Sequence, residues 1–381
     1  MDTRSQIKTN FVAGALTSTY FSIRSVMPLV LSVLAGAYGF SEGQLGDIGS
    51  AYSVGATFIA MTSVVWRRGL LLRLPVTLLL VLGLAALSCA FIAKDYHSML
   101  ATFFVAGVGL GGVYSLMIAL LARSDNPTRS LGWQWGLGSA PGVLLLCAIP
   151  AFATPAGGVR TTFTLILASN LLMALAAIAL PSRLKAQPRP VAQAGSAGYS
   201  PSTGLRVWIA LFGLCALYVG VTGGWAFLGR LARQAGLAAQ YSGTILAIGA
   251  AVSSVVAVVA GELGDRGARR ASMTAAGTAI LIALALIGYW PTRLGFAVGA
   301  IAFIALASFV LTFGTAIVAR LDTDGRTAAL PAAALGLGAM LGPTLAGHVY
   351  EARGAATMLF ACGLSLLTGV VAYVSVYRKA R

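Results

Sequence analysis

The sequence predicts an all-α integral membrane protein with twelve transmembrane helices in two pseudo-symmetric six-helix bundles. Three observations lead to this fold class. The composition is 58% hydrophobic and only 9% charged, the apolar residues fall in runs long enough to cross a bilayer, and short motifs recur at a fixed distance along the chain. A mean hydropathy of +0.87 over 381 residues is typical of a membrane protein and excludes a soluble domain.

A window of about 19 residues finds twelve apolar runs. They cover about 10–37, 44–66, 74–93, 98–122, 131–152, 161–181, 205–229, 241–262, 271–290, 294–319, 328–350 and 355–377. The first run is far longer than the core of a signal peptide, so we expect no cleaved signal. Ser41-Glu42 has the pattern of a helix N-terminal cap and is expected to open the second helix.

The net charge of +16 reflects membrane topology and does not indicate nucleic acid binding. With a cytoplasmic N-terminus, 19 of the 26 Lys and Arg residues fall on the cytoplasmic side and 6 on the outer side, while Arg24 lies within the membrane. An excess of Lys and Arg in short loops marks the cytoplasmic side. We therefore expect a multi-pass protein of the cytoplasmic (inner) membrane with both termini in the cytoplasm.

Two motifs recur 202 residues apart. Arg67-Arg68 and Arg269-Arg270 each follow the second run of a half, and Pro141 and Pro343 each lie in the fifth run. Two coincidences at one offset indicate a parallel repeat.

The repeat divides the chain into an N-terminal six-helix bundle and a C-terminal one. The expected bounds are 1–182 for the first bundle and 205–381 for the second. Residues 183–204 are rich in Pro, Ala, Gly and Ser and have no apolar period, so they are expected to form a cytoplasmic linker.

The segment between the eighth and ninth runs, Gly261-Glu-Leu-Gly-Asp265-Arg266-Gly-Ala-Arg269-Arg270, resembles the signature loop of the major facilitator superfamily, with its second Gly displaced by one position. Gly338-x-x-x-Gly342-Pro343 and its relaxed copy Gly136-x-x-x-Ala140-Pro141 look like the fifth-helix motif that is frequent in antiporters of this family. Small residues at this spacing predict close packing against another helix. The resemblance covers the whole chain. It implies a secondary transporter with alternating access between two halves.

The resemblance also implies a conformational latch at the cytoplasmic ends of the helices. Its residues would be Gly261, Asp265, Arg266, Arg269 and Arg270. The N-terminal copy of the loop has Ser63 where the repeat places the Asp, so the charge lock is expected in the C-terminal half.

Arg24 is the sharpest functional signal. It lies near the middle of the first run, about 20 Å from the far end at 1.5 Å per residue, which is too far for its side chain to reach the headgroups. A lipid-facing charge there costs about 2.5–3.5 kcal/mol, so Arg24 is expected to face protein or a water-filled cavity. Of the ten Asp and Glu residues, Asp47 is the closest to Arg24 in depth within the membrane. The two residues differ in depth by about 14 Å.

This placement points to a ligand anion bound bidentately by the guanidinium. The alternative is a structural arginine held by backbone carbonyls and Tyr hydroxyls. The resemblance adds that family members for organic anions often carry a first-helix arginine.

Further binding candidates are polar or aromatic residues at mid-membrane depth, for each of which simple packing is the alternative. Thr17 and Tyr20 share a helical face with Arg24, and the others are Tyr52, Tyr114, Tyr218, Thr222 and Trp225. Asp47 and His348 are candidates for proton coupling, and the alternative for Asp47 is a helix-start residue hydrated from outside.

The sequence therefore predicts a secondary transporter for a small organic anion, a carboxylate with an aromatic or amphipathic body, and leaves proton coupling open. A proton-driven drug or metabolite exporter is the second reading, and a non-transporting receptor or scaffold with the same fold is the third. We expect a monomer in the lipid bilayer, with no enzymatic activity, cofactor, metal or nucleic acid partner.

Reporter fusions test the predicted topology. A fusion near Gly195 and one at the C-terminus should both report cytoplasm, because 19 of the 26 basic residues lie on that side. A periplasmic signal at either point would contradict the twelve-helix arrangement.

Overall fold

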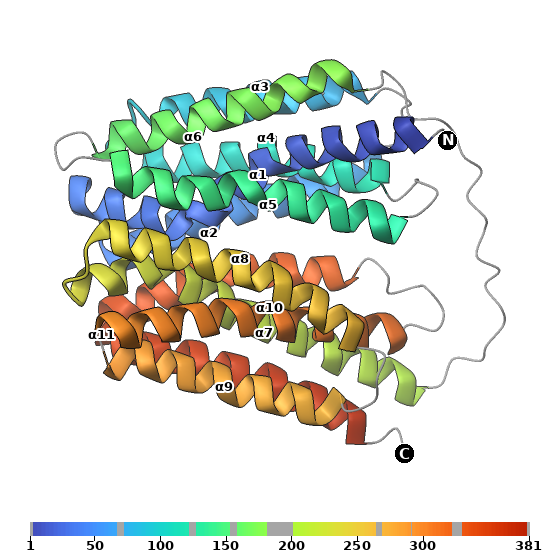
Figure 1. The fold of residues 1–381 in the computed structure, drawn as a ribbon, viewed down its shortest axis with the longest axis vertical. Coiled ribbons are helices and arrows are strands. Elements are labelled where there is room, and N and C mark those ends of the chain that lie inside the picture. The colour runs from blue at the N-terminus through green and yellow to red at the C-terminus, as the bar shows by residue number, and fades with distance from the viewer. Residues whose placement is uncertain are drawn as a thin grey trace. The chain divides into compact units, whose positions relative to one another are not determined.

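The computed structural model describes residues 3–66, 72–121, 127–152, 158–180, 201–263, 269–290, 292–321 and 330–378. Within these ranges all regular structure is helical (Figure 1). The helices are α1 (Thr3–Tyr38), α2 (Glu42–Trp66), α3 (Arg73–Cys89), α4 (Tyr96–Leu121), α5 (Pro127–Phe152), α6 (Gly158–Ala174), the 3-10 helix η1 (Leu175–Ala179), α7 (Pro201–Gln234), α8 (Ala239–Leu263), α9 (Arg269–Tyr289), α10 (Arg293–Leu321) and α11 (Leu330–Arg378).

The predicted apolar runs coincide with these helices to within a few residues at most ends. The last two runs both fall in α11, which is interrupted at Gly354 (φ 81°, ψ 173°). Glycine adopts positive φ without the steric penalty of a Cβ. Residues 330–353 and 355–378 are therefore two helical segments with a sharp turn between them.

Eight helices in the described ranges are long and apolar enough to cross a membrane, with α11 counted once. Two further apolar helices, Arg73–Cys89 and Gly136–Phe152, are shorter. The chain is thus an all-helical multi-pass membrane protein, and the count of twelve crossings stays a prediction.

The chain divides into two compact units. Unit 1 comprises Met1–Phe40 and Asp47–Pro188, and unit 2 comprises Ser41–Gly46 and Arg189–Arg381. The first turn of α2 thus belongs to unit 2, although the rest of that helix belongs to unit 1. α7 begins at Pro201, inside the predicted linker, and linker residues 183–200 lie outside the described ranges.

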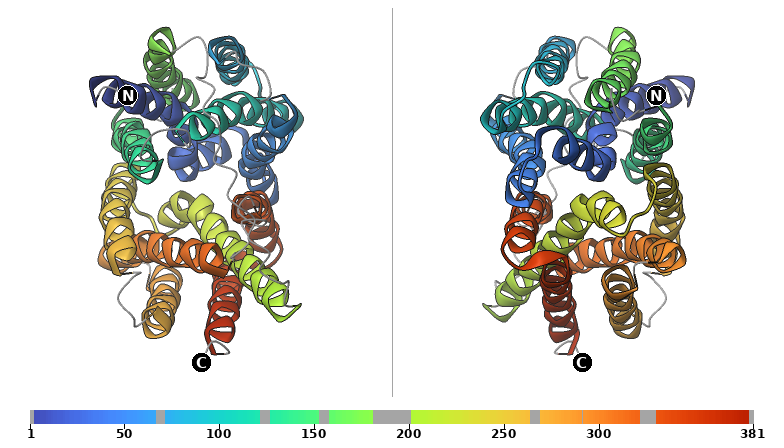
Figure 2. Two further views of the ribbon diagram at one scale, coloured as in Figure 1. Left: turned by 90° about the vertical axis from the view of Figure 1, so that its right-hand side faces the viewer. Right: turned by 90° about the vertical axis from the view of Figure 1, so that its left-hand side faces the viewer.

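In unit 1, α1 packs against α4, α5 and α6, and Figures 1 and 2 show α1 and α5 side by side. Small residues allow this approach: a Cβ on Gly142 would lie 2.6 Å from the Cβ of Ser25, and one on Gly138 would lie 3.0 Å from the Cγ2 of Thr17. Gly136, in contrast, is exposed and has open space where its Cβ would be. The close contact that the sequence suggested at Gly136-x-x-x-Ala140 is made two residues later, by Gly138 and Gly142.

In unit 2, α7 packs against both segments of α11. A Cβ on Gly338 would lie 2.7 Å from the Cβ of Tyr218, and one on Gly342 would overlap the hydroxyl of Thr222. On the other segment, a Cβ on Gly220 would lie 2.6 Å from the carbonyl oxygen of Cys362. Because lipid gives little hydrophobic drive for helices to associate, such close backbone packing stabilises the bundle.

The two copies of the fifth-helix motif should respond in opposite ways to alanine. Gly342→Ala forces a methyl group into α7 and should destabilise the protein by about 1–3 kcal/mol. Gly136→Ala places its methyl group in open space within a helix and should stabilise by about 0.5–1 kcal/mol. Thermal unfolding in detergent measures both, and a Gly342→Ala variant that unfolds at the wild-type temperature would contradict the packing account.

Candidate functional site

Arg24 lies in α1, within the candidate membrane span Ile7–Tyr38. Its side chain is half-buried, whereas its neighbours one turn before and after it, Tyr20 and Met27, are buried. The guanidinium lies near the phenol groups of Tyr52 in α2 and Tyr114 in α4. Three helices of unit 1 thus contribute to the surroundings of this guanidinium.

The three predicted tyrosines of unit 1 form one aromatic cluster. Tyr20 stacks on Tyr52 with ring centroids 5.3 Å apart and on Tyr114 with centroids 5.1 Å apart, at interplanar angles of 14° and 5°. The Tyr52 hydroxyl donates a hydrogen bond to the backbone oxygen of Tyr20 at 3.0 Å. Phe21 meets Tyr20 and Tyr114 edge-on.

Exposure separates the members of this cluster. Tyr20 is 5% exposed and Tyr52 1% exposed, so the structure packs both rings against protein. Tyr114 and Arg24 are only half-buried. Tyr114 and the neighbouring Arg24 therefore keep side-chain surface that protein does not cover, whereas Tyr20 and Tyr52 do not.

Thr17 is fully buried and pairs with a residue that sequence reasoning did not select. Gln134 of α5 donates a hydrogen bond from Nε2 to Thr17 Oγ1 at 2.6 Å. Further along α1, Ser22 Oγ accepts a hydrogen bond of 2.9 Å from the side-chain amide of Asn170 in α6. The amide oxygens of Gln134 and Asn170 are buried, and the described part of the chain offers them no hydrogen-bond partner. The sequence feature that could have identified Gln134 is its amide side chain inside an apolar run.

The candidates on α7 belong to unit 2. The hydroxyl of Thr222 lies 2.8 Å from the carbonyl oxygen of Tyr218 and 3.0 Å from that of Gly338, so it fastens α7 to α11. Tyr218 is buried and Trp225 is half-buried. Of the three, Trp225 keeps the larger exposed fraction.

The two proton-coupling candidates have different surroundings. Asp47 is half-buried in unit 1 and accepts a hydrogen bond of 3.0 Å from the hydroxyl of Tyr96 in α4. His348 is exposed in unit 2, next to Gly43.

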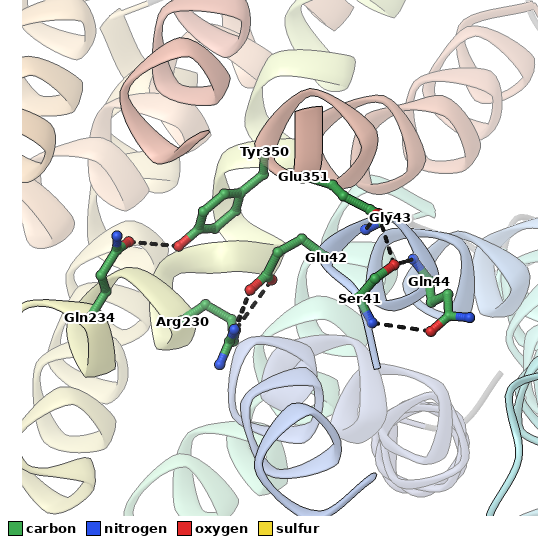
Figure 3. A network of polar contacts seen from close by, with 8 residues as sticks. All are labelled: Ser41, Glu42, Gly43, Gln44, Arg230, Gln234, Tyr350 and Glu351. Carbon is green, nitrogen blue, oxygen red and sulfur yellow. Dashed lines mark hydrogen bonds and ion pairs between the residues drawn. The ribbon is translucent and has the colours of Figure 1, made fainter. Parts of the chain in front are cut away.

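A polar cluster surrounds the first turn of α2 (Figure 3). We name it the α2 clamp, and its residues are Ser41, Glu42, Gly43, Gln44, Arg230, Gln234, Tyr350 and Glu351. Ser41 and Gln44 cap the helix reciprocally: the Ser41 amide donates to Gln44 Oε1 at 3.0 Å, and the Gln44 amide donates to Ser41 Oγ at 3.3 Å. This pair is a capping box and confirms the helix start predicted at Ser41.

Two acidic side chains connect that turn to α7 and α11. Arg230 Nε lies 3.0 Å and 3.2 Å from the two carboxylate oxygens of Glu42, and its Nη2 also contacts that carboxylate. Glu351 Oε2 accepts hydrogen bonds from the Ser41 hydroxyl at 2.7 Å and the Gly43 amide at 2.8 Å. Tyr350 donates to Gln234 beside them at 2.7 Å. Sequence reasoning missed these contacts.

The expected cytoplasmic latch falls largely outside the described ranges. Asp265 and Arg266 are not described. Gly261 lies near the end of α8, and Arg269 and Arg270 open α9, but the described side chains do not include theirs.

Comparisons with known proteins show which family has this architecture. The model of the Major Facilitator Superfamily matches residues 12–323. The nucleoside transporter NupG superposes with a TM-score of 0.72 at 15% identity over 100% of both chains. The xylose transporter XylE from E. coli superposes with a TM-score of 0.73 at 12% identity, over 99% of this chain and 98% of that one.

The human organic anion transporter MFSD10 superposes with a TM-score of 0.62 at 19% identity, over 98% of this chain and 100% of that one. No sequence among curated proteins matches this chain. The family match spans more than half of the chain and agrees with the helical, multi-pass fold. This protein therefore belongs to the major facilitator superfamily, and it is a membrane transporter and not an enzyme.

Proposed function

We propose that this protein is a secondary active transporter that moves a small organic anion of the carboxylate class across the cytoplasmic membrane by alternating access. In this proposal twelve helices form two halves, both termini are cytoplasmic, and the protein works as a monomer. The observation that carries the substrate class is Arg24, a half-buried guanidinium in the middle of a membrane span.

The surroundings of Arg24 suit anion recognition. A guanidinium offers a planar fork of donors that matches a carboxylate bidentately, and in a site of low dielectric such a contact is stronger than in water. The stacked rings of Tyr20 and Tyr52 are buried and rigid, so they hold α1 and α2 in register beside this group. Preorganisation of this kind lowers the entropic cost of binding.

Tyr114 extends the recognition surface beyond the charge. Its ring is half-buried and lies within the electrostatic reach of Arg24. A ligand whose carboxylate meets Arg24 could place an aromatic or amphipathic body against this ring. The fold does not determine the substrate class, because one architecture can transport many kinds of molecule. The similar solved structures include transporters of nucleosides, xylose and organic anions.

Asp47 favours a second candidate function, a proton-driven exporter of drugs or metabolites. A half-buried carboxylate bonded to Tyr96 is a group that a proton could neutralise during transport. A panel of labelled aliphatic and aromatic carboxylates, compared with cationic dyes in proteoliposomes, separates the two functions. Counterflow of any of these probes excludes a receptor or scaffold that moves nothing.

Arg24 variants test the substrate anchor. Arg24→Ala should lower carboxylate binding and uptake by about 10-fold or more, the effect of losing a hydrogen bond to a charged group worth roughly 1.5–3 kcal/mol. Arg24→Lys should recover little, because lysine lacks the bidentate fork. Arg160→Ala, which removes an exposed arginine of α6, is the matched control and should leave uptake unchanged. The proposal fails if Arg24→Ala binds carboxylates normally, or if its loss of binding comes with a large drop in melting temperature that Arg24→Lys restores.

Tyrosine variants test the division of roles within the aromatic cluster. Tyr20→Ala removes a buried stacked ring and should destabilise the protein by about 3–5 kcal/mol, whereas Tyr20→Phe keeps the stack and should preserve both melting temperature and binding. Tyr114→Ala should weaken aromatic carboxylates more than short aliphatic ones, because it removes the ring at the ligand surface. If Tyr20→Phe abolished binding without any change in melting temperature, the Tyr20 hydroxyl would be a ligand contact and its supporting role would be wrong.

A further inference from the structure

A groove in unit 2 shares no residue with the candidate site. It lies between α9 and the second segment of α11, which pack side by side (Figure 2). Its volume is about 310 Å³, a size found among ligand sites. The lining side chains are apolar except for the hydroxyl of Tyr289. Both helices belong to candidate membrane spans, so the molecule that fits this groove is an apolar one.

Two glycines set the width of the groove. A Cβ on Gly288 would lie 2.9 Å from Cδ1 of Leu359, and one on Gly363 would lie 3.2 Å from Cδ2 of Leu281. All four residues line the groove, so a side chain at either glycine would take up space between the helices. The same two contacts show that the helices run antiparallel, because the later residue of α9 meets the earlier residue of α11.

The groove has the depth of one membrane leaflet. Its lining begins at Tyr289 on α9 and at Ala356 on α11, and it extends to Leu281 and Leu367. At 1.5 Å per residue these stretches are about 12 Å and about 16 Å long. Half of the hydrocarbon core of a bilayer is about 15 Å. An acyl chain that enters at the membrane surface therefore matches the length of the groove.

Aromatic and basic residues gather at the Tyr289 end of the groove. Tyr289 and Trp290 are exposed, and such rings are enriched where the membrane meets water. Arg293 begins α10 four residues after Tyr289, and Arg353 lies at the turn between the two segments of α11. Both arginines are exposed, and within the described ranges neither guanidinium has an ion-pair partner. This end of the groove is therefore cationic.

We infer that the groove binds an anionic phospholipid of the expected outer leaflet, with one acyl chain between α9 and α11 and the phosphate at Arg293 and Arg353. A guanidinium binds phosphate oxygens bidentately, and basic residues at a membrane surface attract anionic lipids. A second copy of this chain fits less well, because a symmetric interface pairs one patch with itself. The arginines of both copies would then repel one another.

Native mass spectrometry tests the headgroup. The purified full-length protein, stripped of lipid in detergent, is mixed with phosphatidylglycerol or with phosphatidylethanolamine of the same acyl chains. Phosphatidylglycerol should bind about 5-fold more tightly, and Arg293→Gln or Arg353→Gln should each lower its affinity by about 5-fold, the effect of one basic residue near anionic lipid. Arg160→Gln, which changes an exposed arginine of α6, is the control and should bind as wild type does. Equal affinities for the two lipids, or wild-type affinity in both arginine variants, would overturn the inference.

A pair of tryptophan variants tests the position of the acyl chain. Ala285→Trp places an indole in the groove and should weaken phosphatidylglycerol binding by about 5-fold or more, which corresponds to roughly ten lost atom contacts. Ile282→Trp is the matched control, because Ile282 is exposed on α9 but does not line the groove, and it should leave the affinity unchanged.

Melting temperatures show whether these variants fold. If Ala285→Trp does not, Ala356→Phe fills the groove from α11 instead. A folded, groove-filled variant with wild-type affinity for phosphatidylglycerol would overturn the inference. A wild-type dimer that the groove-filling change dissociates would also overturn it, because a second chain and not a lipid would then cover this face.

Discussion

A charged group in the middle of a membrane span must be surrounded by protein or water, and this constraint organises unit 1. The cost of leaving Arg24 in lipid is several kcal/mol, and the helix that carries it packs against α4, α5 and α6. The buried hydroxyls of Thr17 and Ser22 and the stacked ring of Tyr20 face those neighbours and α2. The polar side chains of α1 thus all have neighbouring helices of unit 1 to pack against.

The corresponding helix of unit 2 reaches the same central place by different chemistry. α7 approaches both segments of α11 through Gly220 and Gly223, and the hydroxyls of Thr222 and Ser365 bond the two helices together. Packing there relies mainly on glycines, whereas packing around α1 combines the glycine contacts of α5 with amides, hydroxyls and aromatic rings. Of the two helices, α1 is the one that carries a charged candidate for recognition, Arg24, within its membrane span.

Sequence reasoning located helices well because length and hydropathy are local properties, and the cap at Ser41 was predictable because its partner Gln44 is three residues away. It could not choose Gly138 over Gly136 as the packing residue, because the choice depends on the rotation of α5 about its axis. It also missed the pair of Glu42 and Arg230, which are 188 residues apart, because the sequence around either residue does not indicate the other as its partner. The stacking of Tyr20 on Tyr52 and Tyr114 was not predictable for the same reason.

α2 joins the candidate binding region to the clamp. Tyr52, which stacks on the ring next to Arg24, lies ten residues after Glu42, or about 15 Å along the helix. Asp47 lies between them and is held by Tyr96. A ligand shifts an equilibrium only through contacts that differ between two states, and a continuous helix transmits such a difference along its axis without intermediate partners. In the proposed transporter, an anion that changed the packing around Tyr52 would therefore act on the first turn of α2 as well.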